Sequence, residues 1–253
     1  MGVRTMDEGA TITTGRPAVL KPGLFGVQAA ADNRRGVFDM HNEALLARGA
    51  PVDAVFIGDS ITDMWALDAY FQGASAPGFI VNRGIGGDRT PFVRRRFASD
   101  VLQLRPRLAV VKIGVNNTWD LDIWWDPSLI RAPKDIEDEI VGDVAAMVRE
   151  ARAAGIAVAL CSILPTDVPF NGNTAVRNGL IARANDRLRD LARAEDAVYV
   201  DYHRHLVSGD GLTLRAGLAD DGLHPHSVGY DIMAGVLLAT LAASGRDEIT
   251  ARA

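Results

Sequence analysis

Three residues of this chain could together form a nucleophilic triad. Ser60 stands in the segment Gly-Asp-Ser-Ile-Thr, and Asp221 and His224 stand in Asp-Gly-Leu-His-Pro. A serine hydroxyl is a weak nucleophile until an imidazole within hydrogen-bond reach takes its proton. A carboxylate three residues before that histidine, across a turn that contains Gly222, can bend back and stabilise the imidazolium. These residue types predict covalent catalysis on Ser60, with His224 as general base and Asp221 as its orienting carboxylate.

Two further polar segments could supply the hydrogen-bond donors that acyl transfer needs. A glycine loop runs from Gly84 to Gly87, and Asn116 and Asn117 follow the next apolar run. The tetrahedral intermediate carries an oxyanion, and each preorganised donor aimed at it can contribute roughly 2.7–4 kcal/mol of transition-state stabilisation. A glycine also lets the backbone approach substrate without a Cβ in the way. Gly87 and Asn116 are therefore candidate oxyanion donors.

Each of these segments also has an ordinary structural interpretation. Glycine, aspartate and serine are common in turns and at helix N-caps, so Ser60 could simply begin a helix. Asn116, Asn117 and Asp221 could likewise be helix caps. The glycine loop could be a tight turn or a phosphate cradle, although no Gly-Lys-Ser/Thr follows it as a P-loop requires. The full ordered set of segments favours catalysis over these separate explanations.

In order and spacing, the four segments resemble the motifs of the SGNH/GDSL hydrolase superfamily: Gly-Asp-Ser, a glycine loop, Gly-x-Asn-Asp and a late Asp-x-x-His. The resemblance spans roughly Val52 to Leu241, and the stretch Asn82 to Thr90 looks especially like the catalytic subunits of platelet-activating-factor acetylhydrolase. Two residues depart from the pattern. Ile61 replaces the usual leucine after the serine, and Asn117 replaces the usual aspartate after the asparagine. Neither exchange touches a proposed catalytic atom.

The resemblance implies a role for each of five residues. Ser60 would be the nucleophile, His224 the general base and Asp221 the carboxylate that orients it. The backbone N–H groups of Ser60 and Gly87 and the side chain of Asn116 would form the oxyanion hole. The reaction that this set implies proceeds through an acyl-enzyme, and neither a metal nor a cofactor is expected.

Four more residues are expected to bind substrate. Trp119, Trp124 and Trp125 cluster directly after the oxyanion segment, and Asp59 immediately precedes the nucleophile. Aromatic faces suit both alkyl chains and sugar rings, although the tryptophans could equally be plain packing. The expected substrate is a small-molecule or carbohydrate ester.

The elements that must position these residues follow from the apolar pattern. Short β-branched runs alternate with longer segments of helical period, which is typical of a parallel sheet covered by helices. The proposed strands are Ala54 to Ile57, Phe79 to Val81, Leu108 to Ile113, Ala157 to Ile163 and Ala197 to Val200. Ligands bind at the carboxyl ends of such strands, so the polar segments should meet at one edge.

Helical periodicity separates the later strands. Ile136, Ile140 and Val144 recur at four-residue spacing in a helix that ends near Gly155. Two more helices are predicted over Thr174 to Arg193 and Ser227 to Leu241. We therefore predict an α/β fold, a flavodoxin-like three-layer α/β/α sandwich with a five-stranded parallel sheet.

We predict a single catalytic domain with two flanking segments. Residues 1–50 would form an N-terminal arm that leads into one helix near Arg35 to Arg48, residues 51–245 the hydrolase domain, and residues 246–253 a C-terminal tail. The 253 residues carry no internal repeat or linker that would divide the hydrolase region.

Composition excludes several classes of partner. The net charge is −5 with no basic block, which argues against nucleic-acid binding. The longest apolar stretch, near Ile232 to Ala243, is too short for a membrane span, and the N-terminus lacks the apolar core of a secretory signal. The single cysteine, Cys161, lies in an apolar run and should be buried. A reducing, cytoplasmic location is expected, and the oligomeric state is not predicted.

The sequence thus predicts a serine esterase that acts on short to medium acyl esters, including O-acyl groups on carbohydrates. An acyltransferase would use the same triad and would differ only in the acceptor of the acyl group. A noncatalytic carbohydrate-binding protein of the same fold is the alternative from another class. Retention of the serine, the histidine and the aspartate together speaks against that alternative.

Overall fold

The core of the molecule is a five-stranded parallel sheet with the strand order β3-β1-β4-β5-β6. The computed structural model describes residues 17–26, 29–75, 78–123, 126–169 and 171–252. The strands are β1 (Val52–Gly58), β3 (Phe79–Gly84), β4 (Leu108–Lys112), β5 (Ala157–Cys161) and β6 (Val198–Val200). All five overlap the predicted runs, although β3 ends three residues later and β5 two residues earlier than expected.

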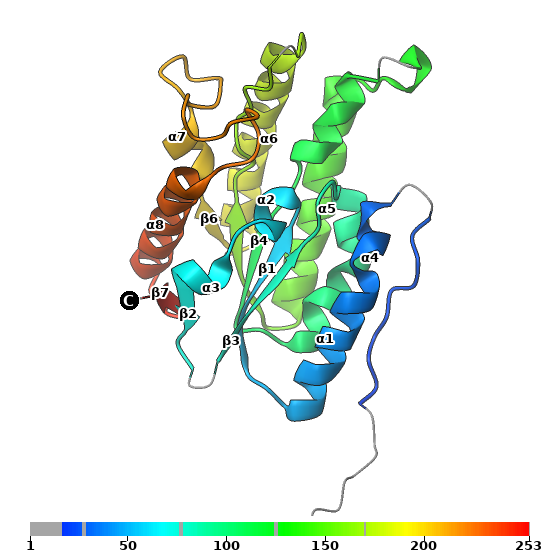
Figure 1. Cartoon of the computed structure of the whole chain (residues 1–253), viewed down its shortest axis with the longest axis vertical. Coiled ribbons are helices and arrows are strands. Elements are labelled where there is room, and N and C mark those ends of the chain that lie inside the picture. Colours follow the sequence, from blue (N-terminus) through cyan, green and yellow to red (C-terminus); the bar gives the residue numbers. More distant parts are fainter. Residues whose placement is uncertain (1–16, 27–28, 76–77, 124–125, 170, 253) are drawn as a thin grey trace, which may run out of the picture.

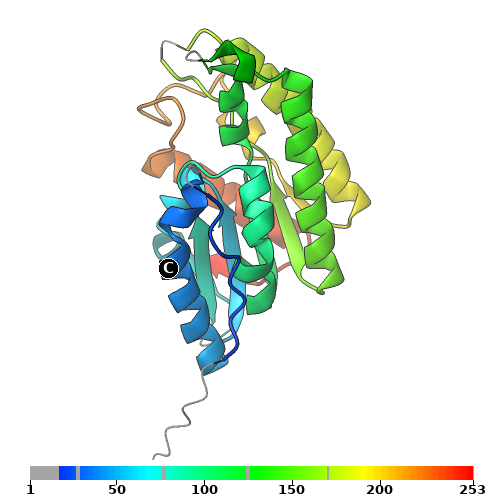
Figure 2. The ribbon, with the colours of Figure 1, turned by 90° about the vertical axis from the view of Figure 1, so that its right-hand side faces the viewer.

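Helices cover both faces of this sheet, so the predicted three-layer α/β/α fold is confirmed. The long helices are α1 (Arg35–Arg48), α4 (Thr90–Asp100), α5 (Pro133–Ala153), α6 (Thr174–Ala194) and α8 (Ser227–Ala243). Short ones are α2 (Ser60–Asp63), α3 (Leu67–Tyr70) and α7 (Tyr202–Leu206), with 3-10 turns at 30–33, 102–104, 115–121 and 127–129. Figures 1 and 2 show α1, α4, α5 and α6 on one side of the sheet and α8 with α3 on the other.

The burial pattern explains why these segments take these forms. All seven residues of β1 are buried, as expected for a central strand that pairs in parallel with β3 and β4. Along α5, Ile136, Ile140 and Val144 are fully buried, so the predicted stripe packs on the sheet. The α4 segment lacks such a stripe because its buried face includes Arg96 and Asp100 besides Val93 and Phe97. Because charged residues occupy part of its buried face, apolar periodicity does not predict this helix.

Both flanking segments contact the main body. Residues 249–251 form β7 (Ile249–Ala251), which pairs antiparallel with β2 (Phe71–Gly73), so the expected tail contains a strand. In the arm, the Phe25 ring contacts the Phe92 ring of α4 edge-on, with 6.2 Å between the ring centroids. The Arg95 guanidinium lies 4.2 Å from the centroid of the Phe25 ring. These aromatic contacts tie the arm to α4.

Sheet topology determines where a ligand can bind. From β1 the chain passes to β3 on one side and then to β4 on the other, so the strand order reverses beside β1. In open parallel sheets the crevice at such a reversal, beyond the carboxyl ends of the strands, is the usual ligand site. Ser60 follows β1 and Asn116 follows β4, so both lie at this point. Within the described ranges, the helices include none that is long and apolar enough to cross a membrane.

Candidate active site

Ser60 lies on a tight turn that joins β1 to α2. The Asp59 carboxylate caps this helix by accepting the backbone N–H of Ile61 at 3.1 Å. A Cβ at Gly58 would lie only 2.1 Å from the carbonyl oxygen of Lys112, so the turn can approach β4 only with glycine there. The turn therefore presents Ser60 at the carboxyl edge of the sheet.

The structure brings the three predicted triad residues together in a continuous hydrogen-bonded chain. Ser60 Oγ lies 2.8 Å from His224 Nε2, across 164 residues of sequence. His224 Nδ1 lies 2.5 Å from Asp221 Oδ2. This order of contacts leaves Nε2 to accept the serine proton while the carboxylate holds Nδ1–H.

Backbone geometry explains how Asp221 turns back onto the histidine. Gly222 has φ 74°, and a Cβ there would lie 2.0 Å from the Asp167 carbonyl oxygen. The carboxylate also accepts the backbone N–H groups of Leu223 at 2.9 Å and His224 at 2.8 Å. Burial raises the pKa of Asp221, but the hydrogen bonds from the His224 ring and from these two amides outweigh it and lower the pKa to about 2. The orienting carboxylate is therefore ionised at neutral pH.

The glycine loop after β3 lies beside the nucleophile. A Cβ built on Gly86 would be 3.9 Å from the Ser60 Cβ. Gly87 has φ 79°, a left-handed conformation that favours glycine. The loop therefore brings backbone rather than a side chain close to Ser60, as the proposed role of the Gly87 N–H requires.

Asn116 lies at the start of the 3-10 turn that follows β4, and its side-chain amide is held at both ends. Its Nδ2 donates to the Asp88 carbonyl oxygen at 3.0 Å, and its Oδ1 accepts from Trp119 Nε1 at 3.2 Å. Among the described residues this nitrogen has one acceptor, and since it carries two hydrogens the second can bind another acceptor. This fixed orientation is what a preorganised oxyanion donor needs.

Trp119 is half-buried and fixed in place, while the other two tryptophans lie outside the described residues. The Arg177 guanidinium stacks 4.1 Å from the Trp119 ring centroid, and Arg177 has no exposed surface. Trp119 therefore helps to orient Asn116, a role that its position in the sequence did not suggest. The substrate-binding role of Trp119, Trp124 and Trp125 stays a prediction.

Asp59 does not have the surroundings of a substrate-binding residue. Its carboxylate is completely buried and lies 3.1 and 3.3 Å from the Lys112 ammonium, itself almost fully buried. A side chain with no exposed surface holds the turn before Ser60 in place and is out of reach of substrate in this structure. A lysine at the end of an otherwise apolar strand was the signal in the sequence that could have indicated this buried partner.

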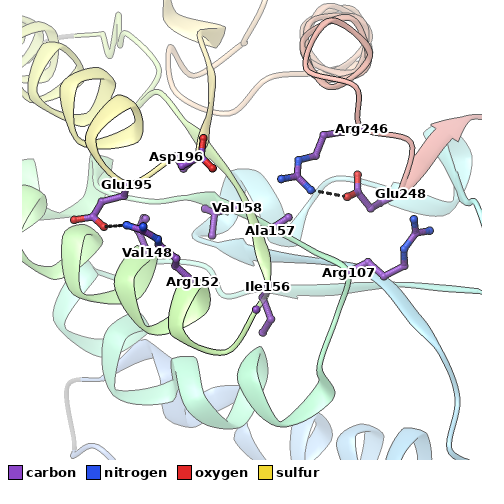
Figure 3. A pocket seen from close by; sticks show the side chains of 12 residues that line it. Arg107, Val148, Arg152, Ile156, Ala157, Val158, Glu195, Asp196, Arg246 and Glu248 are labelled. Atoms are coloured by element: carbon purple, nitrogen blue, oxygen red, sulfur yellow. Dashed lines mark hydrogen bonds and ion pairs between the residues drawn. The ribbon is translucent and has the colours of Figure 1, made fainter.

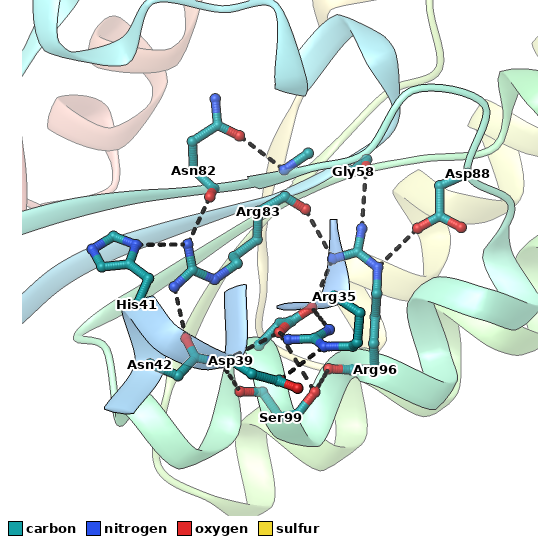
Figure 4. Close-up of polar contacts among 12 residues, drawn as sticks. Arg35, Asp39, His41, Asn42, Gly58, Asn82, Arg83, Asp88, Arg96 and Ser99 are labelled. Atoms are coloured by element: carbon teal, nitrogen blue, oxygen red, sulfur yellow. Dashed lines mark hydrogen bonds and ion pairs between the residues drawn. The ribbon is translucent and has the colours of Figure 1, made fainter. Parts of the chain in front are cut away.

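A cluster of buried arginines near the glycine loop was also missed from the sequence. Arg96 and Arg83 have almost no exposed surface, and Figure 4 shows them with Arg35, Asp88 and neighbouring polar groups. Burial and the positive charges of other arginines lower the pKa of Arg83 to about 10, so it remains protonated at neutral pH. Arg94, Arg95 and Arg96 are consecutive in sequence, and nothing in that run indicates which one is buried.

A hollow of about 410 Å³ lies at the opposite end of the sheet (Figure 3). It is lined by Arg107, Ile156 and Ala197, which precede β4, β5 and β6 respectively, so it opens at the amino edge. Two ion pairs lie in its lining, Arg152 with Glu195 and Arg246 with Glu248. The triad instead lies on an open surface, where the His224 and Asp221 side chains are 28% and 55% exposed.

Within the part of the chain that the structure describes, no three His, Cys, Asp or Glu side chains are arranged to hold a metal ion. The charged groups around Ser60 are instead paired with one another, as Asp59 is with Lys112.

Comparison with known proteins adds a family and several relatives. The model of the GDSL-like lipase/acylhydrolase family matches residues 56–232. An acetylxylan esterase from Xylanibacter ruminicola is 26% identical over 210 residues, which are 73% of this chain and 42% of that protein. The chain thus spans less than half the length of this curated relative.

Solved structures share the fold over most of the chain. A protein described as an acylhydrolase from Bacteroides fragilis superposes with a TM-score of 0.68 at 28% identity, covering 85% of this chain and 98% of that one. A protein described as a platelet activating factor from Streptococcus pneumoniae superposes with a TM-score of 0.65 at 22% identity, covering 83% and 93%. The first match covers nearly the whole of the Bacteroides chain.

Proposed function

The chain belongs to the GDSL-like lipase/acylhydrolase family, and from this premise we propose that it is a serine esterase that forms an acyl-enzyme on Ser60. Membership confirms the family predicted from the four motifs, and it supports the proposal of a carboxylic ester hydrolase. The observation that carries the mechanism is the chain of contacts from Ser60 through His224 to Asp221, at 2.8 and 2.5 Å.

The reaction begins with attack of Ser60 Oγ on the ester carbonyl carbon. His224 Nε2 takes the hydroxyl proton as the new C–O bond forms, and Asp221 stabilises the imidazolium. The carbonyl oxygen becomes an oxyanion within reach of the N–H groups of Ser60 and Gly87 and the free Nδ2 hydrogen of Asn116. Collapse of this intermediate expels the alcohol, which receives the proton from His224.

Hydrolysis of the acyl-enzyme completes the cycle, with water in the place of the alcohol. His224 removes a proton from water, and the resulting hydroxide attacks the acyl group on Ser60. A second tetrahedral intermediate forms in the same oxyanion hole, and its collapse releases the acid and restores the serine hydroxyl. Asp221 remains ionised throughout, in keeping with its lowered pKa.

We propose short acyl esters, and acetyl groups on carbohydrates in particular, as the substrates. The similarity to an acetylxylan esterase supports this choice. The open placement of the triad supports it as well, because the Asp221 side chain is 55% exposed and a bulky sugar could approach from solvent. We also propose a cytoplasmic location, since the only cysteine, Cys161, is buried and unpaired.

A hydrolysis screen tests this proposal. Purified protein would be assayed on p-nitrophenyl esters of two to ten carbons and on acetylated xylo-oligosaccharides, with Ser60→Ala as the matched control. We expect turnover to be fastest on acetyl esters and to be absent in the control. Labelling by a fluorophosphonate probe should follow the same pattern. A wild-type protein that binds acetylated sugars but neither hydrolyses them nor takes up the probe would contradict an enzymatic function.

A further inference from the structure

Arg96 makes four hydrogen bonds within the buried arginine cluster (Figure 4). It comes from α4, and its side chain has no exposed surface. Its guanidinium donates to Asp88 Oδ2 at 2.8 Å, the Arg83 carbonyl at 2.9 Å, Asp100 Oδ2 at 3.0 Å and the Gly58 carbonyl at 3.1 Å. One side chain thus joins β1, β3, the glycine loop and α4.

These contacts lead to each of the three proposed oxyanion donors. Gly58 lies two residues before Ser60, at the end of the strand that carries the nucleophile. Asp88 follows Gly87 directly, so a carboxylate fixed by Arg96 limits how far the Gly87 amide can move. The carbonyl oxygen of the same Asp88 accepts Asn116 Nδ2 at 3.0 Å. The hydrogen bonds of Arg96 therefore converge on the backbone that positions all three donors.

We propose that Arg96 is a positioning residue for the oxyanion hole. By holding the Gly58 carbonyl and the Asp88 carboxylate on one rigid plane, it sets the distance between the nucleophile turn and the glycine loop. It does not touch substrate. This inference rests on the proposed function, because it assumes that the three donors stabilise an oxyanion.

The chemistry of arginine suits this task. Its planar guanidinium offers five N–H donors in a fixed fork and stays protonated, so it can bind two carboxylates and two carbonyl groups at once. In a buried site such bonds are strong and restrict motion. A lysine would keep the positive charge but has no planar fork, and displacement of catalytic groups by about 1 Å can cost roughly 100-fold in rate.

The test compares Arg96→Lys with Arg35→Lys. Arg35 is a matched control because it is also buried and binds the same Asp100, at 2.6 and 2.9 Å, while its third contact goes to Asp39. Rates are expressed per active site titrated with a fluorophosphonate, which removes any loss of folded protein. We expect kcat of Arg96→Lys to fall about 10- to 100-fold with KM within about twofold, and Arg35→Lys to stay within about threefold.

A transition-state analogue distinguishes displacement of the oxyanion donors from a general loosening of the fold. A trifluoromethyl ketone adds to the serine to give a tetrahedral adduct whose oxyanion occupies the hole, whereas the product alcohol does not use it. For Arg96→Lys, affinity for the ketone should fall by about the same factor as kcat/KM, while affinity for the alcohol stays the same. Asp88→Asn should show the same pattern, and the double variant should lose little more than the worse single variant.

Two results would overturn the inference. One is a kcat per titrated site in Arg96→Lys equal to that of the parent. The other is an equal loss in Arg35→Lys, which would mean that the cluster is only structural. If Arg96→Lys does not fold, Asp88→Asn decides the matter by the same readouts. Retained hydrolysis in Ser60→Ala would instead refute the proposed function, so the two failures are distinguishable.

Discussion

Two clusters of charged residues border Ser60, and they are built in opposite ways. Asp221 and His224 are three residues apart on one loop, and their side chains remain partly exposed. Arg96 and Asp88 are completely buried, and the partners of Arg96 come from several elements. In the proposed mechanism, the first cluster takes part in the reaction and must be accessible to substrate and water. The second cluster would position the backbone around the reaction and is shielded from solvent.

This difference in burial assigns different energetic roles to the two clusters. An exposed ion pair contributes about 0–1 kcal/mol to stability because solvent screens it. Removing one partner of a buried pair leaves an unpaired charge and costs about 3–5 kcal/mol. Substitutions in the exposed cluster should therefore mainly affect turnover, whereas substitutions in the buried cluster should affect turnover and stability together.

The largest expected effect is on turnover, in the exposed cluster. Ser60→Ala and His224→Ala should each lower kcat by about 10⁴- to 10⁶-fold, because members of a triad act as one unit. Thermal unfolding of both variants should match the parent closely, since neither change opens a cavity in the core. Steady-state assays and calorimetry check this, and comparable turnover in either variant would remove the triad from the mechanism.

The second largest expected effect is on stability, in the buried cluster. Arg96→Met should lower the free energy of unfolding by about 3–5 kcal/mol, because Asp88 would lose its guanidinium partner and Asp100 one of two. Asp221→Asn is the matched variant, and it should change stability by less than about 1 kcal/mol while lowering turnover by up to about 10⁴-fold. Urea unfolding at neutral pH measures both. Equal destabilisation of the two variants would erase the contrast between the clusters.

A smaller effect is expected where the two regions meet, at Asn116. Trp119→Phe removes the Nε1 donor that holds Asn116 Oδ1 but keeps most of the ring that packs under Arg177. A hydrogen bond of this kind contributes about 0.5–1.5 kcal/mol, so kcat should fall roughly 2- to 12-fold. Chain-length preference on p-nitrophenyl esters should stay the same. A changed preference with unchanged kcat would show that Trp119 binds the substrate instead.

A fourth prediction concerns how the stability contributed by Asp221 in the exposed cluster depends on pH. The folded-state pKa of Asp221 is lowered to about 2, below the ordinary value of about 3.9, so its contribution to stability is present above pH 4 and is lost as pH falls through 2. The stability difference between the parent and Asp221→Asn should therefore shrink as the pH falls from about 5 to 2. Urea unfolding across this range measures it. A difference that grows on acidification would have the wrong sign.

The smallest expected effect concerns Cys161, at the end of β5. Burial is the main reason that the pKa of this thiol is raised to about 12, so little thiolate exists at pH 8. The native protein should not react with Ellman's reagent and should keep full activity, whereas protein in guanidinium should release one equivalent. Fast reaction of the folded protein would mean that the core around β5 opens far more readily than the buried clusters suggest.

The candidate triad residues and the five strands could be predicted because their signals are local. A run such as Leu108 to Lys112 shows its strand character in consecutive residues, and Asp221 and His224 sit close together in one motif. Helix α4, the β2–β7 pair and the roles of Asp59 and Arg96 were not predictable in this way. A buried charge looks like a surface charge in sequence, because its partners come from distant segments.

The sequence alone indicated the five strands of the parallel sheet, helices α5, α6 and α8, and the candidate nucleophile, base and carboxylate, because apolar periodicity and short motifs depend on neighbouring residues. Only the tertiary structure decided that Asp59 is sealed beneath Ser60 with Lys112 and that Trp119 holds Asn116. It also decided that Arg96 joins the backbone of β1 to the glycine loop. The physical reason is desolvation: whether a charged side chain is hydrated at the surface or must find partners in the interior depends on which elements pack over it.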